Sequence, residues 1–485
     1  MADQLVHLPQ QLLVLLLFIA PFFFFFLIRS MRRRDGGSVR LPPSPWALPV
    51  IGHLHHLMGT LPPHHAMRDI ALRHGPLVWL RLGGLQVILA SSVDAAREGI
   101  VFTPYGDSWR NLRKICTVEL LSAKRVQSFR PIREEEVGRL LRAVAAASPA
   151  RRAVNLSELI SAYSADSTMR ALIGSRFKDR DKFLMLLERG VKLFATPSLP
   201  DLYPSSRLAE LISRRPRQMR RHRDEVYEFL DIIIKEHQEN RSSSDDQEDL
   251  DLVDVLLRIQ RKGDFPLSTD NIKTTIGDLF NGGSETTATT LKWIMAELIR
   301  NPRVMQKAQD EVRQVLGKHH KVTEEALRNL SYLHLVIKEG LRLHPPGLPL
   351  LLRESRTTSQ VLGFHVPQGT MILVNMWAIS RDPMYWDQAE EFIPERFEHV
   401  NIDYYGTDVK YMPFGVGRRI CPGIAFGLVN LELVLASLLY HFNWELPDET
   451  ELGNLDMKEE MGAIARRLHD LSLVPVIRHP LPVDM

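Results

Sequence analysis

The sequence predicts a mainly α-helical protein with small β-sheets, of the α+β class. Helical periodicity dominates from about Ser108 to Arg342. Two β-rich runs flank this region, at residues 76–92 and 359–380. Because 45% of the 485 residues are apolar, the chain can bury a large core. We therefore expect one domain over residues 54–485.

The first element is a candidate membrane span. Residues 12–28 form an uncharged apolar run, at the short end of the about 17–25 residues that cross a bilayer. Four arginines between residues 29 and 34 follow it, and no Lys or Arg precedes it. A cleaved signal peptide would show the opposite arrangement of basic residues. We therefore expect an anchor and basic stop at residues 1–34, with the N-terminus across the membrane and the rest cytoplasmic.

The remaining elements follow in order. The prolines in residues 35–53 exclude a helix and predict a stiff hinge. A helix is expected over residues 64–75, and the β-rich runs around Gly83 and Gly84 predict a hairpin. Polar residues 239–249 predict a surface loop within the helical region, and a long apolar helix is expected over residues 424–440.

Composition excludes several classes of function. A formal net charge of +3 gives no sign of nucleic-acid binding, so we expect no nucleic-acid partner. Two cysteines are too few for a disulfide framework or a structural zinc site. They fit a reducing compartment.

One of the two cysteines lies in the loop PFGVGRRICPG, residues 413–423. Thiolate is a strong iron ligand, and glycines let backbone amides approach the sulfur. A helix that starts just after the cysteine would favour thiolate over thiol. A small buried cysteine in a turn is the alternative. The pattern F-x-x-G-x-R-x-C-x-G favours the ligand, because it is met at Phe414, Gly417, Arg419, Cys421 and Gly423.

This loop resembles the haem-binding signature of the cytochrome P-450 family of haem-thiolate monooxygenases. The resemblance covers the chain from Pro42 onward. The anchor, the hinge and the His-Pro-Pro sequence at 344–346 resemble the plant microsomal group that oxidises specialised metabolites. The resemblance implies the cytochrome P-450 fold, with haem b between an oxygen-activation helix and the helix after the cysteine loop. Cys421 is then the axial ligand of the iron.

Three further residues match the structural core of that family. Glu339 and Arg342 lie one helical turn apart and share a face. Arg396, in the sequence FIPERF, resembles the third member of a Glu-Arg-Arg cluster. We expect the cluster to support a haem pocket and to take no part in catalysis.

The sequence IGDLFNGGSETTATTLKW, residues 276–293, resembles the oxygen-activation helix. Gly282 and Gly283 lack side chains and would let the helix pass close over a flat cofactor. The resemblance implies that Glu285 and Thr286 are the catalytic acid and hydroxyl of a proton relay. A polar patch in an ordinary helix is the alternative.

The other cofactor contacts are arginines and one tryptophan. Trp109 and Arg113 match a W-x-x-x-R pattern whose side chains reach a haem propionate in the family. Arg353 resembles a further propionate partner, and Arg419 is suited to a haem carboxylate because its guanidinium is a planar donor fork.

One junction departs from the family pattern. Only eleven residues separate Arg97 from Trp109, where relatives have a helix and a long loop over the distal haem face. Roughly two to three dozen residues are missing near Glu98 and Gly99, beyond ordinary variation in loop length. We expect haem ligation to survive and substrate binding to suffer, because this loop normally roofs the substrate pocket.

Three functions remain open. The first is a monooxygenase of the endoplasmic reticulum membrane, single-pass with a luminal N-terminus, which uses O2 and electrons from NADPH-cytochrome P-450 reductase. Arg110, Lys114 and Arg418 would form the basic docking face. The second is a haem-binding chain that is catalytically impaired. The third is an O2-independent isomerase or dehydratase, which the acid–threonine pair disfavours.

The substrate is expected to be a small lipophilic molecule. The residues expected around the pocket are apolar, namely Phe194, 276–280 and 348–352. By resemblance, terpenoids are the leading class. Aromatic oximes, indoles and fatty acids remain open.

Overall fold

The structure is a computed structural model. It describes residues 40–91, 106–174, 179–195, 198–241, 251–263, 267–317, 322–347, 350–400, 402–447, 455–460, 462 and 464–482. The predicted anchor, residues 35–39 of the hinge and the shortened junction at residues 98–100 lie outside the described residues. So do most of the predicted surface loop at 239–249 and part of the predicted pocket wall at 348–352.

Helices make up most of the described chain, as predicted. They are α2 (Pro63–His74), α3 (Asp107–Lys114), α4 (Ala123–Ser128), α5 (Arg130–Ala145), α6 (Leu156–Ile173), α7 (Arg180–Ala195), α8 (Leu199–Leu202), α9 (Arg207–Ile212), α10 (Arg215–Arg241), α11 (Leu252–Lys262), α12 (Thr269–Arg300), α13 (Pro302–Leu316), α14 (Glu324–Leu327), α15 (Ser331–Leu343), α16 (Met376–Ile379) and α17 (Ile424–His441). Short helical turns are η1 (Leu54–His56), η3 (Ile115–Leu120), η4 (Ser148–Ala150), η5 (Pro394–Phe397) and η6 (Gly417–Arg419).

Small sheets complete the fold. The strands are β1 (Leu77–Leu82), β2 (Leu85–Ala90), β3 (Val154–Asn155), β4 (Leu350–Glu354), β5 (Ser359–Val361), β6 (Phe364–Val366), β7 (Met371–Asn375), β8 (Phe442–Glu445) and β9 (Ser472–Ile477). Among the described residues, the four-stranded sheet has the order β1-β2-β7-β4, with β2 and β7 parallel and the other pairs antiparallel. The predicted hairpin around Gly83 and Gly84 is confirmed as β1–β2.

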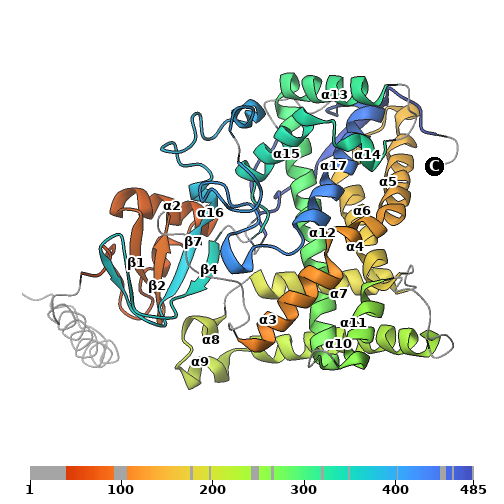
Figure 1. Ribbon diagram of the computed structural model, residues 1–485. Coiled ribbons are helices and arrows are strands. Elements are labelled where there is room, and N and C mark those ends of the chain that lie inside the picture. Colours follow the sequence, from red (N-terminus) through yellow and green to blue (C-terminus); the bar gives the residue numbers. More distant parts are fainter. Residues whose placement is uncertain are drawn as a thin grey trace, which may run out of the picture.

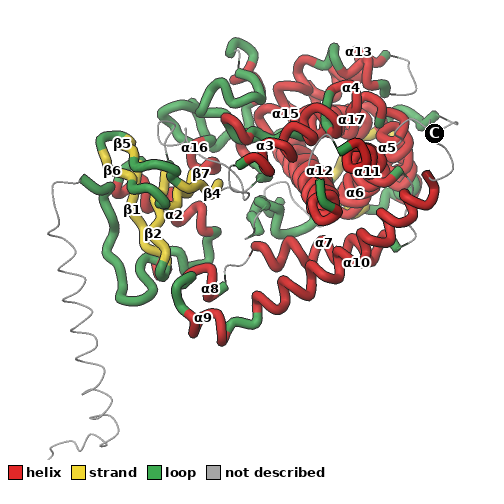
Figure 2. The backbone as a smooth tube through the Cα atoms, turned by 60° about the horizontal axis from the view of Figure 1, so that its bottom comes forward, coloured by secondary structure: helices red, strands yellow, loops and turns green. Residues whose placement is uncertain are grey.

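The molecule has a β-rich side and a helical side (Figure 1). The four-stranded sheet and α2 lie on the left of that view, and the helices pack around α12 on the right. From below, α7 and α10 run side by side along one edge of the helical part (Figure 2), and they contact each other. This arrangement confirms the mainly helical architecture with small sheets that the sequence predicts.

Helix α12 is the central helix of this arrangement. Its 32 residues give a length of about 48 Å. Ser268 caps its first turn, because its hydroxyl accepts from the Asn271 N–H at 3.1 Å. The helix packs against α6, α15 and α17. It therefore carries its polar segment at 281–287 through the middle of the protein.

Helix α17 is a core helix. Among the described residues it is the one helix long and apolar enough to cross a bilayer, and 72% of it is buried inside the protein. Its side chains join a large apolar cluster with α5, α12, α13 and α15. Burial thus explains its hydropathy, and its start at Ile424 places its N-terminus directly after the cysteine loop.

The described part of the hinge packs on the sheet. Residues 40–53 contain no α-helix, as the prolines predict. The Trp79 N–H of β1 donates to Pro43 O at 2.8 Å, and the His365 N–H donates to Arg40 O at 2.8 Å. This segment is therefore part of the folded domain from Arg40 onward.

Candidate active site

The cysteine loop is shaped by left-handed turns. Gly415 and Gly417 have φ angles of 76° and 73°, a region that side-chain-bearing residues rarely adopt. The Cys421 N–H donates to Phe414 O at 2.9 Å. The Gly423 N–H donates to Cys421 Sγ at 3.3 Å, so a backbone amide at the start of α17 meets the sulfur. The loop therefore fixes the direction of this thiol.

The two cysteines have different surroundings. Burial raises the pKa of the Cys421 thiol, whereas the Gly423 amide and the charge of Arg113 lower it. For Cys116, burial raises the pKa to about 11, and Arg113 offsets part of this rise. Of the two sulfur atoms, only Cys421 Sγ accepts a backbone hydrogen bond among the described residues. Cys421 is thus the sulfur that a backbone amide and a nearby cation favour as a thiolate, against the burial that raises its pKa overall.

Four predicted cofactor contacts lie together beside this loop. The Arg419 guanidinium lies over the Trp109 ring, 4.7 Å from its centroid. The charge of Arg419 lowers the pKa of Arg353, and the charge of Cys421 raises the pKa of Arg113, so each pair lies close enough to interact. The structure therefore brings Trp109, Arg113, Arg353 and Arg419 to one side of the cysteine. We call these four residues the arginine cluster.

Arg353 is the most deeply buried member of the arginine cluster. It is 4% exposed, and its Nε has no hydrogen-bond partner among the described residues. Burial and the neighbouring Arg419 lower the pKa of Arg353 to about 10. A buried cation with an unsatisfied donor is costly unless an anion pairs with it. The cluster is therefore suited to carboxylates that come from outside the chain.

The glycine pair of α12 has two different surroundings. A Cβ on Gly282 would meet no atom within 4 Å, so this side of α12 borders open space. A Cβ on Gly283 would lie 3.0 Å from Thr168 Cγ2 and 3.4 Å from the Phe426 ring. Gly283 thus allows close packing on α6 and α17, and Gly282 leaves room for a flat group.

The predicted relay residues follow on the next turn. The Thr286 hydroxyl donates to Gly282 O at 2.6 Å. Glu285 Oε2 lies 2.8 Å from Arg466 Nη2. Arg466 was missed in the sequence, because it lies far along the chain in a polar segment without a recognisable pattern. The two relay side chains have different partners in this structure.

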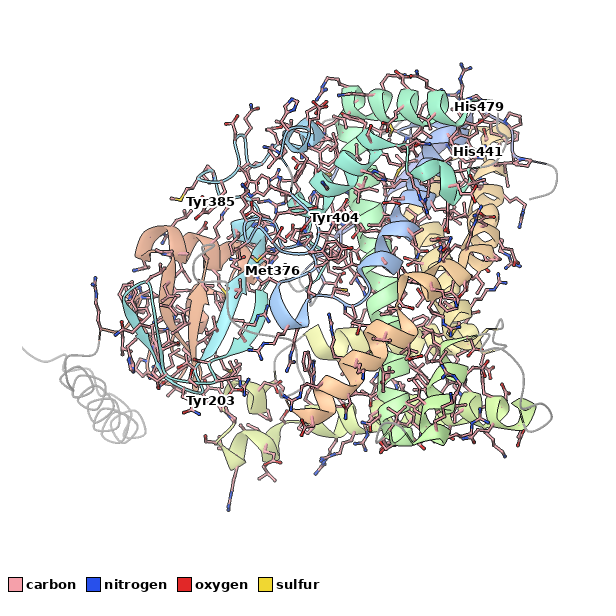
Figure 3. All side chains as sticks on the ribbon, viewed as in Figure 1. Tyr203, Met376, Tyr385, Tyr404, His441 and His479 are labelled. Carbon is pink, nitrogen blue, oxygen red and sulfur yellow. The ribbon has the colours of Figure 1, made fainter. Side chains whose placement is uncertain are left out.

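These observations fit haem. Cys421 offers a directed sulfur for iron, the arginine cluster offers buried donors for two carboxylates, and Gly282 leaves space for a flat ring. The backbone carbonyl of Phe414 accepts from the Cys421 N–H, and the ring of Phe414 meets the ring of Tyr404, labelled in Figure 3, edge-on with centroids 6.0 Å apart. The residues present therefore match an iron-holding planar group with acidic side chains.

The expected pocket wall on α12 is partly wrong. Ile276 and Phe280 are 2% exposed and belong to an apolar cluster with α6, α7, α10 and α11. Helical phase explains this, because the open face of α12 carries Asp278 and Gly282, four residues apart. The Asp278 side chain is exposed at the edge of this face. The protein around it still removes part of the water from its carboxyl, which raises the pKa of that carboxyl. Its spacing from Gly282 was a signal that could have revealed it.

The structural cluster forms a closed set of ion pairs. Glu339 and Arg342 are 0% and 1% exposed. Arg342 Nε donates to Glu339 Oε2 at 2.7 Å, and Arg396 Nε donates to Glu339 Oε1 at 2.9 Å. The FIPERF segment is therefore tied to α15.

The comparison with known proteins agrees with this site. The sequence model of the cytochrome P-450 family matches residues 89–471. Similar proteins include desmethyl-deoxy-podophyllotoxin synthase of Sinopodophyllum hexandrum, 45% identical over 91% of this chain and 93% of that protein. Dolabradiene monooxygenase of Zea mays is 44% identical over 91% and 93%. Amorpha-4,11-diene 12-monooxygenase of Artemisia annua is 41% identical over 89% and 92%.

The same comparison indicates missing residues. The alignment with the synthase runs over 473 positions but takes in 91% of the 485 residues here, about 441, so roughly 30 aligned positions have no residue in this chain. This number is similar to the two to three dozen residues that the family pattern lacks between Arg97 and Trp109. The alignment length and the covered share give the number of unmatched positions, and they do not say where in the chain these positions lie.

Proposed function

This chain belongs to the cytochrome P-450 family, and from that premise we propose that it is a membrane-anchored monooxygenase of a lipophilic specialised metabolite, using O2 and electrons from NADPH. Members are oxidoreductases that hold haem b through a cysteine thiolate. The observation that carries the proposal is the convergence of the Cys421 sulfur, the arginine cluster and the open face of α12.

Each residue has a task in this reaction. When bound, haem supplies the iron at which O2 is activated for transfer of one oxygen atom to a C–H bond. The Gly423 amide keeps Cys421 directed and its charge stabilised. The arginine cluster orients the carboxylates of the group. Glu285 holds a proton at its carboxylate, and Thr286 passes one at Oγ1.

The relatives support a substrate class for this chain. Two of them are named as monooxygenases of the dienes dolabradiene and amorpha-4,11-diene. Dienes are apolar hydrocarbons, which agrees with the terpenoids expected from the family resemblance. We therefore propose terpenoids as the substrate class of this chain. The apolar pocket that such a substrate needs excludes water from the reacting atoms.

Exposed apolar side chains support attachment to a membrane, which we place in the endoplasmic reticulum. Leu208 and Leu211 of α9 are 65% and 79% exposed, and Trp46 is 65% exposed. Tyr203, labelled at the lower edge in Figure 3, connects these segments, because its hydroxyl donates to Val50 O at 3.5 Å. The patch lies in the same part of the fold as the start of the domain, where the anchor would join.

The electron donor would dock on the cysteine side. Arg418 lies in the cysteine loop, and Arg110 and Lys114 lie on α3, which also carries Trp109. All three are exposed. A basic face at this position suits an acidic flavoprotein reductase, because complementary charge guides docking.

A haem-binding but impaired chain is the second candidate. The roughly 30 unmatched positions favour it, because a shorter distal loop would open the pocket to water. An isomerase or dehydratase has less support, because Glu285 and Thr286 are both present.

A graft experiment separates these candidates. The full chain is compared with a version that carries a relative's loop at Glu98/Gly99, both reconstituted with reductase. We expect both chains to show a thiolate-type band in the reduced CO-difference spectrum. If the chain is a working monooxygenase, both also form product from amorpha-4,11-diene. Product from the graft alone would support the impaired candidate. Absence of the band from both would contradict haem-thiolate function.

A further inference from the structure

Two histidines at the start of α2 converge on one carboxylate near the C-terminus. His64 Nε2 lies 2.7 Å and His65 Nε2 lies 3.2 Å from Glu459 Oε2. The possible ligand atoms of the three residues all lie within 4.8 Å of one another. The histidines are 395 and 394 positions away from the glutamate in the sequence, so only the fold brings them together. We call these three residues the two-histidine group.

The two-histidine group is held by the protein and open on one side. The side chains of His64 and Glu459 are 6% and 7% exposed, and that of His65 is 24% exposed. The Trp377 Nε1–H donates to the other carboxylate oxygen, Glu459 Oε1, at 3.0 Å. Trp377 belongs to α16, which packs against α2 (Figure 1). A hydrogen bond of this kind orients a carboxylate whose second oxygen binds a metal.

The spacing of the group suits an ion of the zinc class. Zinc binds imidazole nitrogen and carboxylate oxygen at about 2.0–2.2 Å, which places two tetrahedral ligand atoms roughly 3.3–3.5 Å apart. The nitrogen–oxygen separations of His64 and His65 from Glu459 are 2.7 and 3.2 Å. They fall short of the tetrahedral spacing by less than about 1 Å, which small side-chain rotations supply. Two imidazoles and one carboxylate, with water in the fourth position, are a known donor set for zinc.

The protonation of the group also suits a metal. Burial lowers the pKa of His64, although Glu459 offsets part of this fall. Burial raises the pKa of the Glu459 carboxyl, but the hydrogen bonds from His64 and His65 lower it more, to well below its usual range. Neutral imidazole and ionised carboxylate are the forms that bind metal ions.

Two arginines near the group have a carboxylate of their own. The guanidinium groups of Arg381 and Arg68 lie over the Trp377 ring, 4.3 and 4.8 Å from its centroid. Arg381 Nε donates to Glu390 Oε2 at 3.1 Å, and Arg68 Nη1 donates to Glu390 Oε1 at 3.0 Å. The charge of Arg381 also lowers the pKa of Glu459. Because Glu390 pairs with both arginines, Glu459 keeps its Oε2 for the histidines.

We propose that His64, His65 and Glu459 form a binding site for one divalent ion of the zinc class, with a water molecule as the fourth ligand. The ion would join α2, at the start of the folded domain, to the segment at 455–460. A β-bridge between Glu459 and Arg467 extends this connection further along the chain. Occupation of the site would therefore stabilise the contact between the β-rich side and the C-terminal part of the protein.

The test is a calorimetric titration with ZnCl2 of the full, haem-loaded chain, without a histidine tag and after treatment with EDTA. We expect the wild type to bind one Zn2+ in a saturable site. Trp377→Phe keeps the ring but loses the N–H, and should weaken this binding about 10–100-fold. His64→Gln and Glu459→Gln each remove a ligand and should weaken it more. The matched control is His74→Gln, at the other end of α2 and about 15 Å away along the helix, which should keep the wild-type affinity.

Two further measurements identify the site without using activity. Zinc K-edge X-ray absorption of the wild type should show imidazole nitrogen and oxygen at about 2.0–2.2 Å, with fewer imidazoles per zinc in His65→Gln. Zn2+ should also raise the urea concentration at which the wild type and His74→Gln unfold, because it binds the folded chain. His65→Gln should lose this shift. It is the mildest variant, since His65 is the most exposed ligand and the contact of His64 with Glu459 remains.

The outcomes decide the proposal in each case. A wild type without a saturable zinc site would overturn it. So would adventitious binding by surface histidines only, in which all ligand variants keep the wild-type affinity and His74→Gln loses as much as they do. If His64→Gln or Glu459→Gln does not fold, His65→Gln decides alone, and an unchanged affinity in that variant contradicts the site. None of these results depends on the proposed monooxygenase function, which is tested by the CO-difference spectrum and by product.

Discussion

Two groups of arginines in this protein differ in how their charge is balanced. Arg342 and Arg396 share the Glu339 carboxylate. Backbone oxygens of Ser380, Ala389 and Glu391 accept further N–H groups of Arg342. In the arginine cluster, by contrast, Arg353 is buried with an unsatisfied Nε and a second cation nearby.

The difference separates folding from binding. The Glu339 cluster is complete within the chain, so the fold can form it without a ligand. The arginine cluster, through Arg353, keeps a donor and a buried charge for an external anion. Until that anion binds, the buried cation weakens the fold. The predictions below test this division, from the largest expected effect to the smallest.

Removing the sulfur gives the largest effect. Cys421→Ser is expected to abolish the thiolate-type band in the reduced CO-difference spectrum, because serine provides no thiolate. Cys116→Ser is the matched control, since it removes the other cysteine, and it should keep the band. Circular dichroism checks that both variants fold. A thiolate band that persists in Cys421→Ser would contradict the ligand assignment.

Opening the complete cluster should damage the fold itself. Glu339→Gln leaves two buried guanidinium groups without their carboxylate, so the free energy of unfolding should fall by about 3–5 kcal/mol. Urea unfolding of the haem-free chain measures it. The control is Glu325→Gln, whose side chain is 79% exposed and pairs with Arg130, with an expected loss below about 1 kcal/mol. Equal losses in both variants would argue against a closed cluster.

The arginine cluster should respond with opposite signs in its two states. Arg353→Met removes a buried charge, so the haem-free chain should unfold at the same or a higher urea concentration. Haem affinity should fall by about ten- to a hundredfold, because a charge-assisted hydrogen bond is lost. Haem transfer to apomyoglobin measures this. A variant that destabilises the haem-free chain as Glu339→Gln does would erase the distinction between the two groups.

A partly buried carboxyl on α17, that of Glu432, provides a smaller test with pH. Burial and the charge of Glu324 raise the pKa of Glu432 to about 7, and His334 Nε2 lies 3.5 Å from its Oε1. Its unfolded pKa is near 4.5, so the folded state binds the proton more tightly. This stabilisation is complete below that value and is lost as pH rises through 7.

Glu432→Gln should therefore flatten the pH dependence of stability between pH 5 and 8 by about 1–3 kcal/mol. Thermal unfolding at three pH values compares the variant with the wild type. Parallel curves for the two proteins would show that Glu432 does not titrate in this range.

The sequence predicted the parts of the site that are encoded locally. The cysteine loop, the hairpin at Gly83 and the E-x-x-R helix each depend on neighbouring residues, and so their patterns were legible. Contacts across the fold were not. That Phe280 faces the core depends on which helices surround α12, and that Arg466 meets Glu285 depends on a segment about 180 residues further along.

The parallel pairing of β2 with β7 sets an order of events during synthesis. Ala90 pairs with Val374, so the N-terminal hairpin waits for about 280 further residues before its sheet can close, roughly 15–60 s at ordinary translation rates. In that interval the apolar edge of β2 has no partner strand. A chaperone that covers this edge would thus protect the nascent chain, and aggregation of an unprotected chain should begin at the hairpin.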